Sequence, residues 1–294
     1  MAAAPALGRV LSAMVTPMRP DGSIDLDAAQ RLAAHLVDAG HDGLVVSGTT
    51  GESPTTSAEE KDELLRAVVG AVGDRCVVVA GAGSNDTAKS VESVRLAEKA
   101  GADAVLAVTP YYNKPPQAGL VAHFTAIADA SDLPVMVYDI PGRSGIAIAR
   151  ETYLRIAEHP RIAAVKDARG DLWFASEMMQ LTGLDWYSGD DAMNLPHYVN
   201  GAVGFVGVTS QVAPQAYRRL ADAVLEGRWD DARAVHRGLA PLVDAVMNVT
   251  QGAIMAKAGL AVQGLIESPT VRLPLVAADD AQTALVRDAL EAVS

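Results

Sequence analysis

The stretch from residue 104 to residue 140 reads as a strand, a helix and a second strand. It begins with the apolar run Ala104-Val-Leu-Ala-Val-Thr109, continues through an amphipathic segment at Ala118–Ala130, and ends with Pro134-Val-Met-Val-Tyr-Asp-Ile140. Short β-branched apolar runs that alternate with helical spacing are typical of βα units in a parallel sheet. The stretch therefore predicts an α/β protein.

The same alternation occurs eight times along the chain. We expect strands at Leu11–Thr16, Gly43–Ser47, Val77–Gly81, Ala104–Thr109, Pro134–Ile140, Ile162–Asp167, Asp185–Gly189 and Ala202–Val208. Eight consecutive βα units are the number that closes a (β/α)8 barrel, the TIM-barrel architecture, and a doubly wound open sheet is the alternative.

The eight units leave a C-terminal stretch that reads as helical. We predict the barrel over residues 1–227 and a helical appendage packed on it over residues 228–294, with turns at Gly252, Gly259, Gly264 and Pro269. Because no Ser/Gly linker or low-complexity block separates the two ranges, we do not expect the appendage to be an independent domain.

Composition excludes several classes of protein. The 24 basic and 36 acidic residues give a net charge of −12, with no basic cluster to offset it, so we expect no nucleic-acid partner. The chain has no run of 18 apolar residues and does not start like a signal peptide, so we expect a soluble cytoplasmic protein without a membrane partner. The single cysteine, Cys76, cannot form an intrachain disulfide.

In a barrel of this kind, functional side chains gather in the loops after the strands. Lys166 ends the apolar run Ile162-Ala-Ala-Val165, which carries its ammonium toward the barrel interior. Desolvation there lowers the pKa of a lysine and frees its amine as a nucleophile, so a Schiff-base lysine is one interpretation. A strand-end lysine paired with Asp167 is the other.

Two further strand ends offer groups that can hold a carboxylate. Gly48-Thr49-Thr50-Gly51 combines two hydroxyls with backbone N–H groups in a glycine-flanked turn, although an ordinary turn with a threonine cap has the same spacing. Arg143 lies in the loop Pro141-Gly-Arg-Ser-Gly145, where it can bind a carboxylate with two hydrogen bonds or remain a solvated loop arginine.

Tyrosines and small residues complete the strand ends. Tyr111, Tyr112 and Tyr138 are phenols that could pass protons, or buried tyrosines with satisfied hydroxyls. Gly189 and Val206 fall at the ends of the seventh and eighth runs, and we expect both to contribute to substrate binding. The six histidines show no metal-ligand spacing, so we expect no metal.

Five motifs carry a resemblance over nearly the whole chain. They are Gly48-Thr-Thr-Gly-Glu-Ser53, Thr109-Pro-Tyr-Tyr-Asn113, Tyr138-Asp-Ile-Pro-Gly-Arg-Ser-Gly145, Val165-Lys-Asp167 and Ser188-Gly-Asp-Asp191. In this order the chain resembles the pyruvate-dependent class I aldolases, the family typified by dihydrodipicolinate synthase and N-acetylneuraminate lyase.

The resemblance implies roles for individual residues. Lys166 would form an imine with pyruvate, whose carboxylate is held by Thr49 and Thr50, so no separate cofactor is needed. Tyr138, Thr49 and Tyr112 would form a proton relay, with Tyr112 supplied by a neighbouring subunit. Arg143 would bind the carboxylate of the second substrate. The implied assembly is a homotetramer built as a dimer of dimers.

The resemblance also implies an activity. Pyruvate would condense with L-aspartate-4-semialdehyde to give 4-hydroxy-tetrahydrodipicolinate, the entry to diaminopimelate and lysine. Family members that cleave sialic acid typically carry a Ser-Thr pair where Thr49-Thr50 stands and usually lack an arginine equivalent to Arg143. A lyase that releases pyruvate from a 2-oxo sugar acid, and a catalytically silent barrel used as a scaffold, are the alternatives.

One departure from the family concerns regulation. Lysine-inhibited relatives use two histidines and a glutamate at positions that read Ala58, Lys61 and Lys89 in this chain. Two cations facing a cationic ligand disfavour its binding, so we predict that lysine does not inhibit this protein.

Overall fold

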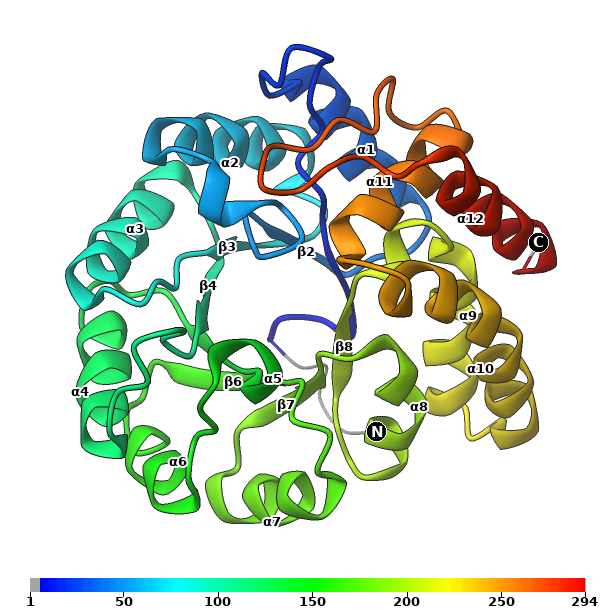
Figure 1. Ribbon diagram of the computed structural model, residues 1–294. Helices are drawn as coiled ribbons and strands as arrows, with labels where there is room; N and C mark the ends of the chain where they lie inside the picture. Colours follow the sequence, from blue (N-terminus) through cyan, green and yellow to red (C-terminus); the bar gives the residue numbers. More distant parts are fainter. Residues whose placement is uncertain (1–5, 294) are drawn as a thin grey trace.

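Eight parallel strands close into one barrel in this computed structural model, which describes residues 6–293. The strands follow chain order around the barrel (Figure 1): β1 (Val10–Ala13), β2 (Gly43–Val46), β3 (Val77–Gly81), β4 (Ala104–Val108), β5 (Val135–Asp139), β6 (Ile162–Asp167), β7 (Asp185–Ser188) and β8 (Gly204–Gly207). The TIM-barrel prediction is therefore confirmed, and the doubly wound sheet is excluded.

Helices surround the barrel on its outside (Figure 1). They are α1 (Leu26–Asp38), α2 (Ala58–Val72), α3 (Thr87–Ala100), α4 (Gln117–Ala128), α6 (Arg150–Ile156), α7 (Leu172–Thr182), α8 (Asn194–Val199) and α9 (Pro214–Leu225). The short helix α5 (Pro141–Ser144) lies instead inside this ring, at the mouth of the barrel. Three short 3-10 turns interrupt the loops: η1 (Ser53–Thr55), η2 (Asp191–Met193) and η3 (Thr209–Gln211). Among residues 6–293, none of the helices is long and apolar enough to cross a membrane.

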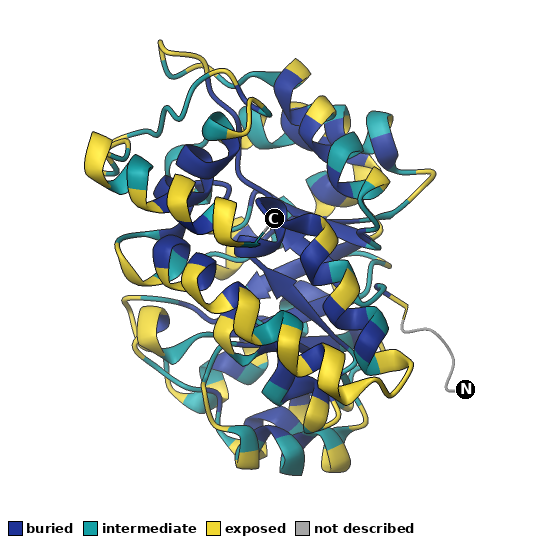
Figure 2. Cartoon of the chain, turned by 90° about the vertical axis from the view of Figure 1, so that its right-hand side faces the viewer, coloured by how far each residue is buried: buried dark blue, intermediate teal, exposed yellow. Residues whose placement is uncertain are grey.

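The strands are apolar because the barrel buries both of their faces. Every residue of β1, β2, β5 and β8 is buried, which suits the continuous Val, Leu and Ala runs that parallel strands require. Figure 2 shows these buried strands through the middle of the molecule, with exposed residues on the outer faces of the helices. Parallel pairing sets Tyr138 of β5 beside Lys166 of β6, so the ends of these two strands lie at one level.

The end of the first strand differs by a few residues from the prediction, because a side-chain hydrogen bond forms there in place of sheet pairing. The first strand was expected to reach Thr16 but ends at Ala13. The Thr16 hydroxyl instead donates to the carbonyl of Gly51 at 2.7 Å, which draws the chain away from the sheet toward the loop after β2. At α2 the start is fixed by a capping box between Ser57 and Glu60.

The C-terminal stretch is helical, as expected. It contains α10 (Trp229–Val243), a π-helical turn η4 (Asp244–Asn248), α11 (Gly252–Val262) and α12 (Asp280–Val293). The predicted boundary between residues 227 and 228 falls between α9 and α10, and the terminal residues 1–5 and 294 of the two predicted ranges lie outside the described residues.

The turn expected at Gly259 is wrong, because this glycine lies inside α11. A Cβ atom there would come within 3.1 Å of the Cγ1 atoms of Val212 and Val286. The absence of a side chain at Gly259 therefore allows α11 to pack closely against the end of η3 and against α12. A glycine at this position reflects helix packing and not a turn. Gly264, which follows α11, does adopt a left-handed conformation with φ of 72°.

Candidate active site

Lys166 occupies the end of β6 and is 4% exposed. Its ammonium lies 4.3 Å from the centre of the Tyr138 ring. Burial lowers the pKa of Lys166 to about 8; the Asp191 carboxylate acts in the opposite direction, and the Arg143 guanidinium lowers it further. A lysine with such a pKa carries an appreciable fraction of free amine near neutral pH, as a nucleophile requires.

Asp167 does not pair with Lys166, although the two are adjacent in the sequence. The Asp167 carboxylate accepts hydrogen bonds from the indole N–H of Trp186 at 3.0 Å and from the backbone N–H of Arg169 at 2.8 Å. No ion pair joins Lys166 to Asp167 within the part of the chain that the structure describes. The strand-end lysine is therefore free to face the barrel interior.

A cavity of about 360 Å³ lies at this end of the barrel and brings the predicted side chains together. Its lining includes Gly48, Thr49, Thr50, Tyr138, Arg143, Lys166 and Gly189. These residues come from four different strand ends, those of β2, β5, β6 and β7, which parallel pairing places around one mouth. The cavity is therefore the candidate active site.

Gly189 has a steric reason to be a glycine. A Cβ atom there would lie 2.9 Å from Cγ and 3.0 Å from Cε of Lys166, and 3.1 Å from the carbonyl oxygen of Asp167. Its backbone N–H also donates to that same carbonyl at 2.7 Å. The lysine side chain thus passes directly over Gly189 on its way to the cavity.

Tyr138 lines the cavity and is buried, with 7% of its surface exposed. Burial raises the pKa of Tyr138 to about 12, with Arg143 acting in the opposite direction. The phenol is therefore protonated at neutral pH and can donate a hydrogen bond or a proton to a group held near Lys166.

The Thr49–Thr50 loop is anchored by backbone hydrogen bonds. The carbonyl of Thr49 accepts from the backbone N–H of Glu52 at 3.1 Å, and the carbonyl of Gly48 accepts from the N–H of Ser53 at 3.2 Å. Thr49 is exposed to the cavity while Thr50 is buried at 7%. Both threonines therefore line the same cavity, and Thr49 is the more exposed of the two.

Tyr112 and Val206 are not part of the cavity lining. Tyr112 is 88% exposed and has a left-handed backbone with φ of 73°, so its ring projects away from the rest of this chain. Val206 is fully buried in β8, and Val208, two residues further on, lines the cavity instead. Tyr111 lines a smaller pocket of about 50 Å³ next to the cavity, together with Tyr138 and Thr49.

The cavity also includes residues that the sequence did not point to. Met247 and Asn248 line it from η4, the π-helical turn of the C-terminal appendage. Single π turns inside helical segments often occur at functional sites. No spacing signal marks these two residues, because their position depends on how the appendage packs against the barrel.

One buried carboxylate, that of Asp191, links two strand ends beside the cavity. Asp191 accepts backbone hydrogen bonds from Val208 at 2.9 Å and from Thr209 at 3.3 Å, so it joins the loop after β7 to the loop after β8. Burial raises the pKa of Asp191.

Among residues 6–293, no three histidine, cysteine, aspartate or glutamate side chains are grouped to hold a metal ion.

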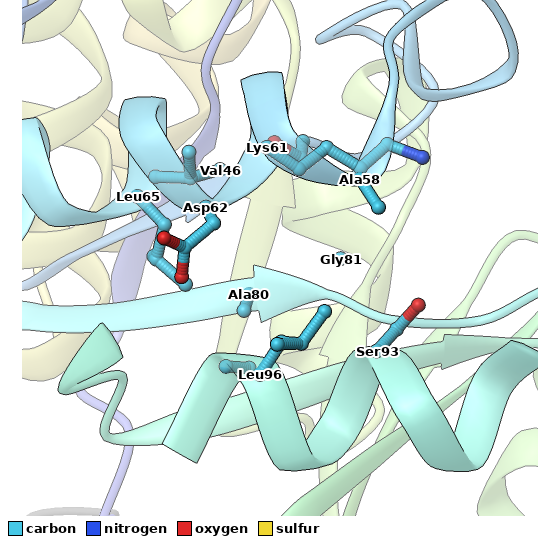
Figure 3. A pocket seen from close by; sticks show the side chains of 11 residues that line it. Val46, Ala58, Lys61, Asp62, Leu65, Ala80, Gly81, Ser93 and Leu96 are labelled. Atoms are coloured by element: carbon cyan, nitrogen blue, oxygen red, sulfur yellow. The ribbon is translucent and has the colours of Figure 1, made fainter. Parts of the chain in front are cut away.

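The positions linked to lysine inhibition lie outside this cavity. Ala58 and Lys61 of α2 line a pocket of about 40 Å³ between α2 and α3, where they face Ser93 and Leu96 (Figure 3). Burial lowers the pKa of Lys61. Lys89 is exposed near the start of α3 and does not line the pocket.

Comparison with known proteins agrees with the fold and with the motifs. The model of the dihydrodipicolinate synthetase family matches residues 6–293. A 4-hydroxy-tetrahydrodipicolinate synthase of Kineococcus radiotolerans is 57% identical over 94% of this chain and 90% of its own length. A second such synthase, from Streptomyces coelicolor, is 58% identical over 92% of this chain and 89% of its own.

Solved structures of the same family superpose closely. The crystal structure of a dihydrodipicolinate synthase from Bacillus anthracis has a TM-score of 0.94 at 38% identity and covers 98% of both chains. A structure described as the first monomeric dihydrodipicolinate synthase variant has a TM-score of 0.93 at 36% identity and covers 97% of this chain and 96% of its own.

The closed (β/α)8 barrel, its buried lysine and the match to the family model together place the chain among the class I, pyruvate-dependent aldolases. The chain belongs to the dihydrodipicolinate synthetase family. These relatives are named as synthases, and their names do not favour the alternative of a sugar-acid lyase.

Proposed function

We propose that this chain condenses pyruvate with L-aspartate-4-semialdehyde to give 4-hydroxy-tetrahydrodipicolinate, in diaminopimelate and lysine biosynthesis. The observation that carries the proposal is the buried Lys166 amine with a lowered pKa, facing a cavity that a tyrosine, two threonines and an arginine share. The synthase names of relatives more than half identical to the chain support the choice of reaction.

The first step uses the free amine of Lys166. It attacks the keto carbon of pyruvate, and loss of one water leaves an imine that acts as an electron sink. The methyl group of the bound pyruvate then loses a proton, and the resulting enamine attacks the aldehyde carbon of the second substrate. The amino group of the adduct finally attacks the imine carbon, which closes the ring and releases Lys166.

The remaining residues bind the substrates and move protons. Thr49 and Thr50 hold the pyruvate carboxylate, and Gly189 lines the same end of the site. Val206, fully buried in β8 and outside the cavity lining, is not assigned a contact with the substrate. Tyr138 and Thr49, with Tyr112 supplied by a neighbouring copy of the chain, pass protons between the reacting groups and solvent. The proximity of the Tyr138 ring to the Lys166 ammonium, 4.3 Å from its centre, supports the first member of this relay.

Arg143 binds the carboxylate of the aldehyde substrate. It lies on the short helix α5, is exposed at the cavity and is followed by Gly145 in a left-handed conformation. A guanidinium at the rim can hold a carboxylate with two parallel hydrogen bonds while the aldehyde end reaches inward toward Lys166.

We also propose that the protein acts as a homotetramer in the cytoplasm. The exposed Tyr112 ring supports the oligomer, because a relay that includes Tyr112 needs it to enter the site of a neighbouring copy. Sedimentation analysis of the wild type tests the oligomeric state, and the activity of Tyr112→Phe tests the role of the Tyr112 hydroxyl. A fully active monomer would contradict the assignment of Tyr112 to a shared site.

Reductive trapping tests the imine directly. Borohydride added with pyruvate is expected to increase the protein mass by about 72 Da at Lys166, the mass of a reduced pyruvate imine. Lys166→Ala is expected to remain unmodified. An unmodified wild-type protein would instead support a catalytically silent barrel.

A further inference from the structure

Four charged side chains join the C-terminal appendage to the loop after β2 and to the first turn of α2. Glu52 and Lys257 form a buried ion pair, 2% and 0% exposed, with Nζ of Lys257 2.5 Å from Oε1 of Glu52. Glu60 and Arg272 form a second pair beside it. Burying a charge is costly unless hydrogen bonds and an opposite charge compensate it, so these groups fix each other's positions closely.

Glu52 terminates the turn that carries Thr49 and Thr50. Its backbone is left-handed, with φ of 57°, and Ser47 at the other end of the turn has φ of 59°. A left-handed backbone is strained for a residue other than glycine and persists where the surroundings impose it. The turn Gly48–Gly51 is thus bracketed by two strained residues that something else must hold in place.

The surroundings that hold Glu52 come from the far end of the chain. Oε1 of Glu52 accepts from Lys257 of α11, and Oε2 accepts from the backbone N–H of Arg272 at 2.8 Å. Lys257 also donates to the carbonyl of Thr270 at 2.7 Å. The loop that joins α11 to α12, orange to red in Figure 1, is thereby fastened over the turn after β2.

Arg272 fastens the same loop at a second place. Its guanidinium donates to the carbonyl of Thr55 at 2.8 Å, to that of Gly22 at 2.9 and 3.0 Å, and to both carboxylate oxygens of Glu60. These contacts lower the pKa of Glu60 to about 2, so the pair is charged at neutral pH. The segment that follows the turn is therefore held at Thr55 and Glu60 as well as at Glu52.

We propose that Glu52 and Lys257 are positioning residues for substrate binding, which set the Thr49–Thr50 turn in the geometry that receives the carboxylate of the 2-oxo acid. The proposal rests on the proposed function of the cavity and deepens it. Neither side chain lines the cavity, so both act through the backbone of the turn. The appendage contributes to the site in this way as well as through Met247 and Asn248.

The test compares Glu52→Gln with the wild type. The amide retains the size of the side chain and one acceptor for Arg272, but removes the charge that holds Lys257. We expect the half-saturating pyruvate concentration in borohydride trapping to rise about tenfold or more, while KM for the aldehyde changes by less than about twofold. A structural defect without a positioning role would lower the amount of active protein without this split.

Glu177→Gln is the matched control. Glu177 pairs with Arg150 at 2.9 Å on the helical surface, away from the cavity, so the same chemical change there should leave both constants at wild-type values. Lys257→Arg keeps the charge with a different shape and is the second variant if Glu52→Gln does not fold. It is expected to raise the half-saturating pyruvate concentration selectively, by a smaller factor.

The outcomes separate this inference from the proposed function. If the wild type forms no pyruvate adduct, the proposed function fails and the inference fails with it. If the wild type is trapped but a folded Glu52→Gln or Lys257→Arg protein has the wild-type half-saturating concentration, only the positioning role is overturned. A selective rise in either folded variant supports it.

Discussion

Burial of Lys166 at the end of β6 decides the chemistry that its amine can perform. At the lowered pKa of about 8, about one amine in ten is uncharged at pH 7, compared with about one in three thousand at the ordinary pKa of 10.5. The apolar strand Ile162–Val165 and the glycine at position 189 together create this environment. The sequence indicated the lysine through that apolar strand, but not the clearance that Gly189 provides.

The pH dependence of imine formation follows from this pKa. Because the neutral amine is the nucleophile, the rate of reductive trapping by pyruvate should rise with pH up to about 8 and then level off. A stopped-time trapping series followed by mass spectrometry measures it. A rate that continues to rise beyond pH 10 would mean that Lys166 titrates as an ordinary solvated lysine.

Substitution of Arg143 should impair the use of the aldehyde substrate but not the binding of pyruvate to Lys166. Arg143→Ala is expected to leave pyruvate trapping intact and to lower kcat/KM for the aldehyde by about tenfold or more, because only the second carboxylate loses its charged partner. Steady-state rates at varied aldehyde concentration provide the measurement. Unchanged aldehyde kinetics in Arg143→Ala would show that this arginine does not bind the acceptor.

At the level of elements, the strands and most helices were predictable because hydrophobic periodicity records burial. The observed α4, Gln117–Ala128, differs by only two residues at most from the expected segment Ala118–Ala130. Gly259 misled the prediction because close packing between helices selects glycine as readily as a turn does. Met247 and Asn248 gave no signal, since only the packing of η4 brings them to the cavity.

The packing of α11 can be tested through Gly259. Gly259→Val is expected to destabilise the protein by about 1–3 kcal/mol, because a side chain there meets Val212 and Val286 at less than ordinary contact distance. Gly238→Val in α10 is the control, since a Cβ atom at Gly238 meets nothing within 4 Å. Equal denaturant midpoints for the two variants would contradict the packing role of Gly259.

The prediction that lysine does not inhibit the protein concerns the pocket between α2 and α3. Lys61 lines it and is partly desolvated there, and the pocket of about 40 Å³ is small for an amino acid. Lysine is therefore expected to leave the rate unchanged in a titration at saturating pyruvate, because a cationic ligand would meet like charge. Half-inhibition by sub-millimolar lysine would contradict this prediction.

At the scale of the whole molecule, residues far apart in the sequence hold the site together. Glu52 was visible in the sequence as part of a motif, whereas Lys257 stood as a single lysine in an apolar helix without an evident partner. Their contact joins segments 205 residues apart, a separation that no local pattern records. The role proposed for Tyr112 was equally beyond local patterns, because the sequence of one chain does not show which surface of a second copy an exposed tyrosine would meet.

The rate with pyruvate and L-aspartate-4-semialdehyde distinguishes a synthase from a sugar-acid lyase. Coupling the product to a reductase that oxidises NADPH gives the rate, and a panel of 2-oxo sugar acids is assayed beside it for pyruvate release. We expect fast coupled turnover without cleavage of any panel member. Absence of condensation, with pyruvate released from one sugar acid, would contradict the synthase and leave only the barrel and its lysine in place.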